Sequence, residues 1–248
     1  MINTKTLSQG IEVLCNNDND FEILIAPHKE KIISLLSCYI NEIELFNPAY
    51  GLVGANNTEE LIIKHILDSL APLGVISRLL SVNRRLNAPT SEPLNRFLIA
   101  DAGSGAGLPG IPLAIALPDC DFSLIERMGR RAGFLRNTKA VLPLTNINNI
   151  EESDLSSITG GQFDLVTFRA FKPLDQKLLK SLFKICAKNG IIAAYKGKRK
   201  KIDEEMAAFT KNPNFSSGEQ RTDIVWEAIP YTVPFLEEER HILVIRRK

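Results

Sequence analysis

The chain has 248 residues, of which 44% are apolar and 24% are charged, and its 30 Lys and Arg nearly balance its 29 Asp and Glu. These totals are typical of a globular protein with one large domain, or one domain with an extension. The sequence has no run of 18 or more apolar residues, no secretion signal, no C-x-x-C pair and only three isolated histidines. We therefore expect a cytoplasmic protein with reduced thiols and with neither a membrane span nor a metal site.

The first 95 residues are expected to form helices, because apolar residues recur there at helical spacing. Asn47-Pro48 is expected to break the helical pattern that precedes it. A further helix is predicted to begin near Asn57-Thr58, where Glu60 is placed to return a capping bond. Residues 83–96 are polar and contain two prolines, so they are predicted to form a linker or a surface loop.

From Phe97 onward, short apolar runs alternate with amphipathic stretches. The expected strands are 97–100, 122–125, 146–150, 163–168 and 191–195, and the expected helices are 111–117, 130–142, 174–188 and 200–211. This alternation predicts a doubly wound, mostly parallel sheet with helices on both faces. The chain continues with two further expected strands, 223–233 and 240–246, with no room for a helix between them. The last strand is therefore expected to run antiparallel.

These elements together predict a Rossmann-like α/β fold over residues 96–248. Residues 1–95 are predicted to be an N-terminal helical extension and linker, which can pack with the α/β part as one unit.

A glycine-rich stretch, DAGSGAGLPGIP (101–112), directly follows the first expected strand. Ligands of open parallel sheets bind beyond the carboxyl ends of the strands, at the point where the strand order reverses. We therefore expect Gly103, Gly105 and Gly107 at a binding crevice, where glycine permits a positive φ and a close approach of the backbone to a ligand.

Three ligand classes compete for a glycine-rich stretch of this kind. A P-loop is excluded, because no Lys-Ser/Thr pair follows them. A loose G-x-G-x-x-G over residues 105–110 leaves a nicotinamide or flavin cofactor open, and a purely structural turn also stays open. Asp101 favours S-adenosylmethionine (SAM), which is cationic and carries no phosphate. Glu126, at the end of the second strand, is placed to accept hydrogen bonds from both ribose hydroxyls.

The segment DAGSGAGLPGIPLAI (101–115) resembles the RsmG/GidB family, the guanine-N7 methyltransferases of small-subunit ribosomal RNA. The continuation GLPGIPL makes the match specific, because SAM enzymes in general do not share it. Other segments resemble further blocks of the family: FNPAYGLVG (46–54), HILDSL (65–70), ERMGRRAGFL (126–135), FDLVTFRAF (163–171), YKGK (195–198) and ERHILVI (239–245). The resemblance covers roughly residues 35–248.

The resemblance implies a SAM-dependent methyltransferase that modifies guanine 527, in the 530 loop of 16S rRNA, with the assembled small subunit favoured as substrate. Gly103 and Leu108 would line the SAM pocket, and Arg169 would belong to the cofactor site. The family's adenine-side segment ends in an arginine, a variable residue and a glutamate, whereas this chain reads EESDL (151–155). Asp154, with Ser153 beside it, is the candidate contact for the adenine amino group.

The chemistry of guanine N7 requires no base, because N7 carries a lone pair and no proton. Catalysis can then consist mostly of placement, which is worth up to roughly 7–11 kcal/mol for a well-oriented pair. The product is cationic, so Arg169 and Lys196 are expected to hold phosphate, guanine O6 or the SAM carboxylate. Lys196, at the carboxyl end of the fifth expected strand, is hypothesised to contact RNA or the target base. The basic run KGKRKK (196–201), which it begins, could contact phosphates.

Other candidate residues have a structural reading beside the functional one. Tyr50 or Phe171 could stack on the target base, and core packing is the alternative for each. The triplet His65, Asp68 and Ser69 lies on one face of a predicted helix, and a hydrogen-bond network is favoured there over a hydrolase triad.

The sequence leaves four functional alternatives open. They are methylation of the 16S guanine, methylation of another RNA site, a nicotinamide-dependent oxidoreductase, and a SAM-binding RNA module without activity. A monomer is the default expectation for the oligomeric state.

Overall fold

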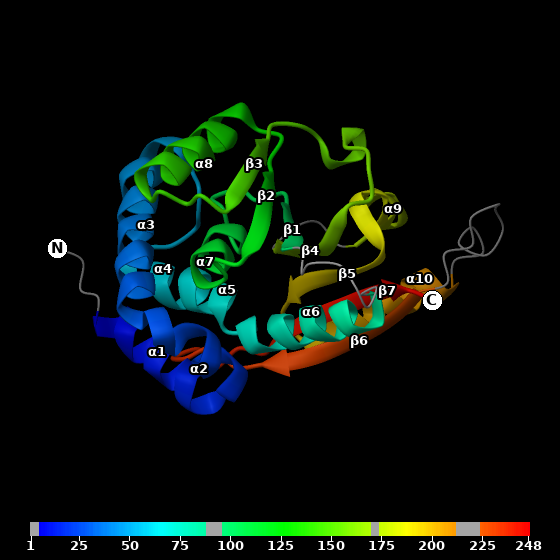
Figure 1. Ribbon diagram of the computed structural model, residues 1–248, viewed down its shortest axis with the longest axis horizontal. Coiled ribbons are helices and arrows are strands. Elements are labelled where there is room, and N and C mark those ends of the chain that lie inside the picture. The colour runs from blue at the N-terminus through cyan, green and yellow to red at the C-terminus, as the bar shows by residue number, and fades with distance from the viewer. Residues whose placement is uncertain (1–4, 88–95, 170–173, 212–223) are drawn as a thin grey trace.

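A computed structural model describes residues 5–87, 96–169, 174–211 and 224–248 of the protein (Figure 1). Within these residues, seven strands form one sheet in the order β3-β2-β1-β4-β5-β7-β6. The strands are β1 (Phe97–Ala102), β2 (Cys120–Ile125), β3 (Ile147–Glu151), β4 (Phe163–Arg169), β5 (Cys186–Lys196), β6 (Ile224–Tyr231) and β7 (Arg240–Arg247).

The described helices follow the same chain order. Before the sheet come α1 (Lys5–Asn17), α2 (Asn19–Ile25), the short 3₁₀ turn Ala26–His28, α3 (Lys29–Tyr50), α4 (Thr58–Leu61), a π-helical segment (Ile62–Leu67), α5 (Asp68–Leu70) and α6 (Leu73–Asn87). Between the strands come α7 (Gly110–Ala116), α8 (Gly129–Val141), the 3₁₀ turn Leu155–Ser157, α9 (Gln176–Ile185) and α10 (Arg199–Lys211).

Strands β1 to β5 are parallel, whereas β7 pairs antiparallel with both β5 and β6. The predicted doubly wound α/β fold and its antiparallel last strand are therefore confirmed. The chain passes from β1 outward to β2 and β3, and then returns to the other side of β1 to form β4. This reversal leaves a crevice at the carboxyl ends of β1 and β4, where such sheets bind ligands.

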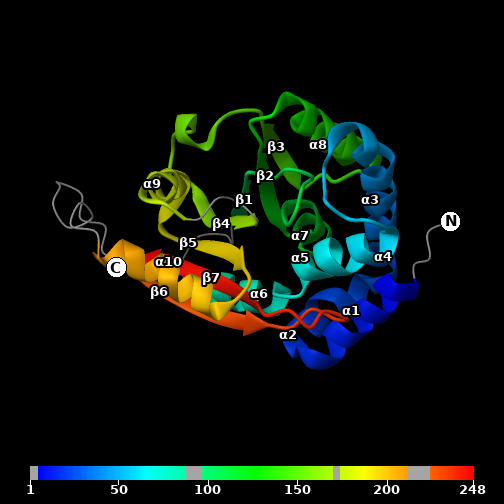
Figure 2. The ribbon, with the colours of Figure 1, turned by 180° about the vertical axis from the view of Figure 1, so that it is seen from behind.

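Helices cover both faces of the sheet. One hydrophobic cluster joins residues of α1–α8 to one sheet face, and a second joins α9 and α10 to the other face. The two views agree: α6 lies in front of the β6–β7 ribbon in Figure 1, and α10 lies in front of it in Figure 2. The N-terminal helices thus share a core with the sheet, and the division into two parts near residue 95 stays a prediction.

The N-terminal helices also hold the glycine-rich loop. The buried Tyr39 hydroxyl of α3 donates a hydrogen bond of 2.7 Å to the carbonyl of Ala106. A residue of the helical part therefore sets the position of the loop that follows β1.

Three sequence expectations about element ends are wrong. The helix before Asn47 does not stop there: α3 continues through Pro48 for a single turn, until Gly51 ends it with a φ of 58°. Residues 83–87 belong to α6, not to a linker, and residues 88–95 lie outside the described residues. The helix expected over 174–188 ends at Ile185, because Cys186 already pairs with β4 in the sheet.

The predicted start of α4 is confirmed, and Glu60 does return a capping bond, but to the residue before the N-cap. The Asn57 side chain accepts a hydrogen bond from the Glu60 N–H at 2.8 Å. Glu60 in turn accepts from the backbone N–H of Asn56, the residue before the cap, at 2.8 Å.

Among the described residues, one helical run, Thr58–Val82, is long and apolar enough to cross a membrane by length and composition alone. Polar residues interrupt the run in the sequence, which hides it from a search for consecutive apolar residues. Within its most apolar window, 72% is buried inside the protein. This burial favours a core helix over a membrane span.

Candidate functional site

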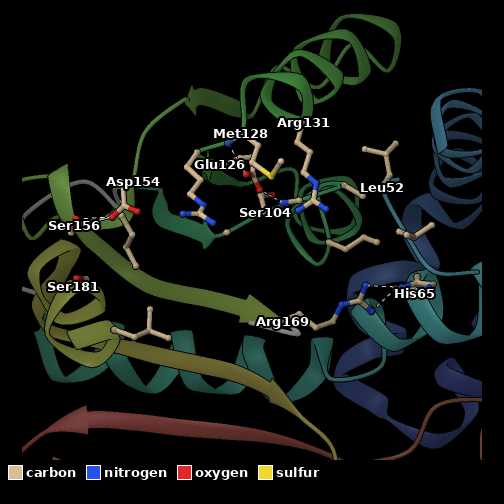
Figure 3. Close-up of a pocket in the computed structure, with 18 of the residues that line it drawn as sticks. Leu52, His65, Ser104, Glu126, Met128, Arg131, Asp154, Ser156, Arg169 and Ser181 are labelled. Atoms are coloured by element: carbon tan, nitrogen blue, oxygen red, sulfur yellow. Dashed lines mark hydrogen bonds between the residues drawn. The ribbon is translucent and has the colours of Figure 1, made fainter. Parts of the chain in front are cut away.

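A cavity of about 560 Å³ opens at the carboxyl ends of β1–β4 (Figure 3), within the usual size range of a small-molecule site. Its lining combines residues from several elements: Leu52, Val53, Gly54, His65, Gly103, Ser104, Gly105, Ala106, Leu108, Glu126, Arg127, Met128, Arg131, Asp154, Leu155, Ser156, Arg169, Asp175, Lys177, Leu178 and Ser181. The cavity lies at the predicted crevice and is lined by Gly103 and Gly105, whereas Gly107 is not among the lining residues.

The glycine-rich loop forms one wall of the cavity with its backbone. Gly103, Gly105 and Gly107 have φ values of 70°, 59° and 92°, as expected for a turn that other residues rarely adopt. A Cβ on Gly105 would find no atom closer than 3.9 Å, whereas one on Gly107 would clash with the Ile111 side chain. Gly105 therefore leaves its backbone open to a ligand, and Gly107 permits tight packing beneath it.

Asp101 supports the loop from below. Its Oδ2 accepts hydrogen bonds from the Ser104 hydroxyl at 2.6 Å and from the Gly110 N–H at 3.0 Å. The residue is 1% exposed and is not among the residues that line the cavity. Asp101 thus holds the loop in shape, rather than facing a cationic ligand as its position in the sequence suggested.

Burial raises the pKa of Asp101 to about 6, although the hydrogen bonds from Ser104 and Gly110 act in the opposite direction. A carboxyl whose folded-state pKa lies above the ordinary value of 3.8 binds its proton more tightly in the folded state. Its contribution to stability is therefore complete below about pH 4 and is lost as the pH rises through 6.

The variant Asp101→Asn cannot titrate at this position, so it tests the shift. Between pH 4 and pH 8 we expect the unfolding free energy of the wild type to fall by about 2–3 kcal/mol relative to that of the variant. Urea denaturation of both proteins at the two pH values measures this difference. A difference that is the same at both values would contradict the shift.

Glu126 lies at the centre of the cavity, just beyond β2. It is 4% exposed, and its two carboxylate oxygens accept hydrogen bonds from the N–H groups of Gly105 at 2.9 Å and Met128 at 2.8 Å. A carboxylate offers about four lone-pair positions, so two remain for a ligand. The first of these contacts places Glu126 beside the glycine loop, and its role toward the ribose hydroxyls stays a prediction.

The structure separates the two residues predicted to contact an adenine. Asp154 is exposed and lines the cavity, where it accepts hydrogen bonds from the Ser156 hydroxyl at 2.6 Å and N–H at 2.9 Å. These bonds lower the pKa of Asp154. Ser153 does not line the cavity, and its hydroxyl is buried with no hydrogen-bond partner among the described residues.

Arg169 lies at the carboxyl end of β4 and lines the cavity with a side chain that is 12% exposed. Its guanidinium donates to Asp68 Oδ2 at 3.1 Å, to the Lys64 carbonyl at 3.2 Å, and to His65 Nδ1 at 2.9 Å. The arginine is therefore held by the π-helical segment and its C-terminal cap.

Asp68 connects the π-helical segment to strands β6 and β7 of the sheet. Besides Arg169, it contacts the Tyr231 hydroxyl at 3.0 Å and Arg240 Nε at 3.3 Å. The Ser69 hydroxyl donates a hydrogen bond to the His65 carbonyl at 2.6 Å. The Ser69 carbonyl accepts a hydrogen bond from the buried Tyr195 hydroxyl at 2.8 Å. The predicted hydrogen-bond network is confirmed in place of a hydrolase triad.

Lys196 is not among the lining residues. Its ammonium is 2.9 Å from both carboxylate oxygens of Glu205 and 5.8 Å from the centre of the Phe168 ring. In the same basic run, Arg199 pairs with Asp203, whereas Lys198, Lys200 and Lys201 are exposed.

The two aromatic candidates for base stacking are placed differently. Tyr50 packs against Phe46, with ring centres 5.3 Å apart, and beneath the guanidinium of Arg130. Phe171 lies outside the described residues.

Sequence reasoning missed the wall that the start of α9 supplies. Asp175, Lys177, Leu178 and Ser181 all line the cavity. The Asp175 side chain caps the helix by accepting a hydrogen bond from the Leu178 N–H at 2.7 Å. Nothing in the sequence indicated that α9 contacts the 3₁₀ turn Leu155–Ser157, which follows β3.

Comparison with known proteins gives a consistent result. The family model of rRNA small subunit methyltransferase G matches residues 32–227. Proteins described as ribosomal RNA small subunit methyltransferase G are similar to this chain. That of Treponema denticola is 38% identical, with 88% of this chain and 87% of the relative covered. That of Yersinia pestis is 33% identical, with 84% of this chain and 86% of the relative covered.

Among solved structures, magnesium protoporphyrin IX methyltransferase from Synechocystis with bound SAM has a similar fold. The TM-score is 0.51 at 15% identity, over 85% of this chain and 97% of that one. At this identity the likeness concerns the fold alone.

Proposed function

Because this chain belongs to the RsmG/GidB family of SAM-dependent rRNA small subunit methyltransferases, we propose that it transfers a methyl group from SAM to N7 of guanine 527, in the 530 loop of 16S rRNA. We further propose that it acts as a cytoplasmic monomer on the assembled small subunit. The observation that carries the proposal is the contact between Glu126 and Gly105. This contact places a buried carboxylate beside an open backbone at the point where the strand order reverses.

The residues of the cavity fit SAM at three places. The loop from Gly103 to Leu108 would hold the methionyl part, because Gly105 leaves room for it. Glu126 would accept the ribose hydroxyls through its two remaining lone-pair positions. Asp154 would bind the adenine amino group, and Ser153 would contribute through the backbone turn that also carries Asp154. Met128 and Leu178 would supply apolar walls.

SAM supplies an electrophilic methyl group, and the protein has to place guanine N7 in line with it. N7 has a free lone pair, so no side chain has to remove a proton. The charges near the cavity suit a cationic product: Arg169 is paired with Asp68, and Lys196 is paired with Glu205. We propose that both cations position RNA or the SAM carboxylate, and that neither approaches N7 itself.

Replacing Glu126 with Gln is expected to weaken SAM binding by about 10–100-fold, because charge-assisted hydrogen bonds are worth roughly 1.5–3 kcal/mol. One oxygen acceptor becomes an NH₂ group, which then faces a backbone N–H. Calorimetric titration with SAM measures the affinity. The control is Glu152→Gln, an exposed neighbour that does not line the cavity, and its affinity should match the wild type. Equal affinities for all three proteins would remove Glu126 from the site.

Transfer of labelled methyl groups from SAM to unmethylated small subunits tests the reaction. We expect label in 16S rRNA, less label on naked rRNA, and less again with the variant Lys196→Ala. Binding of NAD without binding of SAM would support an oxidoreductase instead. Tight SAM binding without transfer to any RNA would support a binding module.

A further inference from the structure

The cavity has two ends, and the proposed function uses only one of them for the nucleoside part of SAM. Figure 3 shows Asp154, Ser156 and Ser181 at one end and Leu52, His65 and Arg169 at the other, with Glu126 and Ser104 between them. If the adenosine lies beside Asp154 and Glu126, the end beside His65 is left for the target base. The inference below rests on the proposed function in this respect.

The hydrogen bond to Arg169 determines which nitrogen of His65 carries the proton. Nδ1 of His65 is 2.9 Å from Nη2 of Arg169. A guanidinium can only donate, so Nδ1 must accept, and the proton of the neutral ring lies on Nε2. Burial, together with the charge of Arg169, lowers the pKa of His65 to about 4, so the ring is neutral at physiological pH.

The ring is also held in place. Arg169, which fixes Nδ1, is itself bound by Asp68 at 3.1 Å and by the Lys64 carbonyl at 3.2 Å. His65 lies in the π-helical segment Ile62–Leu67, a rare conformation that is frequent at functional sites. Among the described residues, none is hydrogen-bonded to Nε2. His65 thus brings a fixed, uncharged N–H donor to the cavity.

We propose that the Nε2–H group of His65 selects guanine at the target position by donating a hydrogen bond to O6 of the base. Guanine presents two acceptors on this edge, N7 and O6, whereas adenine presents N7 and an amino group. A donor at O6 leaves the N7 lone pair free for the methyl group. In adenine an amino group stands in the place of O6, so two hydrogen-bond donors would face each other, which disfavours adenine. Because the ring is neutral, it does not oppose the positive charge of the product.

The test uses small subunits reconstituted with guanine, adenine or 2-aminopurine at the target position, since 2-aminopurine keeps N7 and lacks O6. For the wild type, we expect kcat/KM to fall by about 10–100-fold from guanine to 2-aminopurine, as a buried donor loses its acceptor. For His65→Phe, we expect a similar loss on guanine and no further loss on 2-aminopurine. SAM affinity should stay within about twofold of the wild type.

Two further variants separate recognition from packing. His65→Gln places an amide N–H near the position of Nε2 and is expected to restore part of the preference for guanine. His28→Phe makes the matched change at an exposed histidine and should leave all rates unchanged. Equal sensitivity of the wild type and His65→Phe to 2-aminopurine would overturn the inference, as would a parallel loss of SAM affinity. A wild type that methylates no guanine-containing subunit would overturn the proposed function as well.

Discussion

The variant Gly105→Asp is expected to lose SAM binding and methyl transfer by roughly 1,000-fold, which corresponds to about 4 kcal/mol. The cavity side of Gly105 is open, so a side chain there would occupy the space that the ligand needs. The new carboxylate would also lie next to Glu126, whose Oε2 is 2.9 Å from the Gly105 nitrogen. Juxtaposed like charges cost several kcal/mol in a site with little access to water. Calorimetric titration with SAM and transfer of labelled methyl groups both measure the loss.

Gly51 provides a matched control for backbone strain. Its φ of 58° is nearly that of Gly105, 59°, and a Cβ there would also meet no atom within 4 Å. Gly51 does not line the cavity, so Gly51→Asp should carry the same strain and retain SAM affinity within a few fold. If both variants lost SAM binding equally, strain and not occupation of the cavity would be the cause.

Removal of the Asp68 carboxylate is expected to have the largest effect on stability. Asp68→Ala leaves Arg169 and Arg240 without their shared counter-ion, in a region where the Asp68 side chain is 7% exposed. Breaking a buried ion pair by removing one partner costs about 3–5 kcal/mol, because the remaining charge stays buried. The Tyr231 hydroxyl loses its acceptor as well. Urea denaturation monitored by circular dichroism measures the change in the free energy of unfolding.

Asp203→Ala is the control for this second prediction. Asp203 pairs with Arg199 at 2.8 Å, but both side chains are about half exposed, at 49% and 51%. Exposed pairs contribute about 0–1 kcal/mol, so the control should unfold close to the wild type. A loss below 1 kcal/mol for Asp68→Ala would show that water or the neighbouring carbonyl groups compensate for the missing carboxylate.

Local patterns in the sequence were sufficient to predict most of the sheet and the position of the cavity. The strand that ends at Asp101 and the glycines that follow it are contiguous, so their relation could be read directly. The ends of helices were harder to predict, because tertiary pairing overrides local preference. Cys186 joins β5 opposite Phe163, although the residues around it have a helical pattern.

The network around Asp68 was predictable only in its local part. The spacing of His65 and Ser69 indicated a shared helix face. Arg169 and Tyr231, however, follow Asp68 by 101 and 163 residues, and they reach it only because β4 and β6 end at the same edge of the sheet. The tautomer of His65 follows from one of these distant contacts, so no sequence pattern could have indicated it.

The measurement that tests the central claim most directly is to locate the transferred methyl group on the RNA. Small subunits that lack the modification are incubated with the protein and SAM, and the 16S rRNA is then cleaved chemically at 7-methylguanosine. We expect one new cleavage, at guanine 527 in the 530 loop, and none with Gly105→Asp. Cleavage at another guanine, or label that resists this chemistry, would contradict the proposed site or the proposed atom.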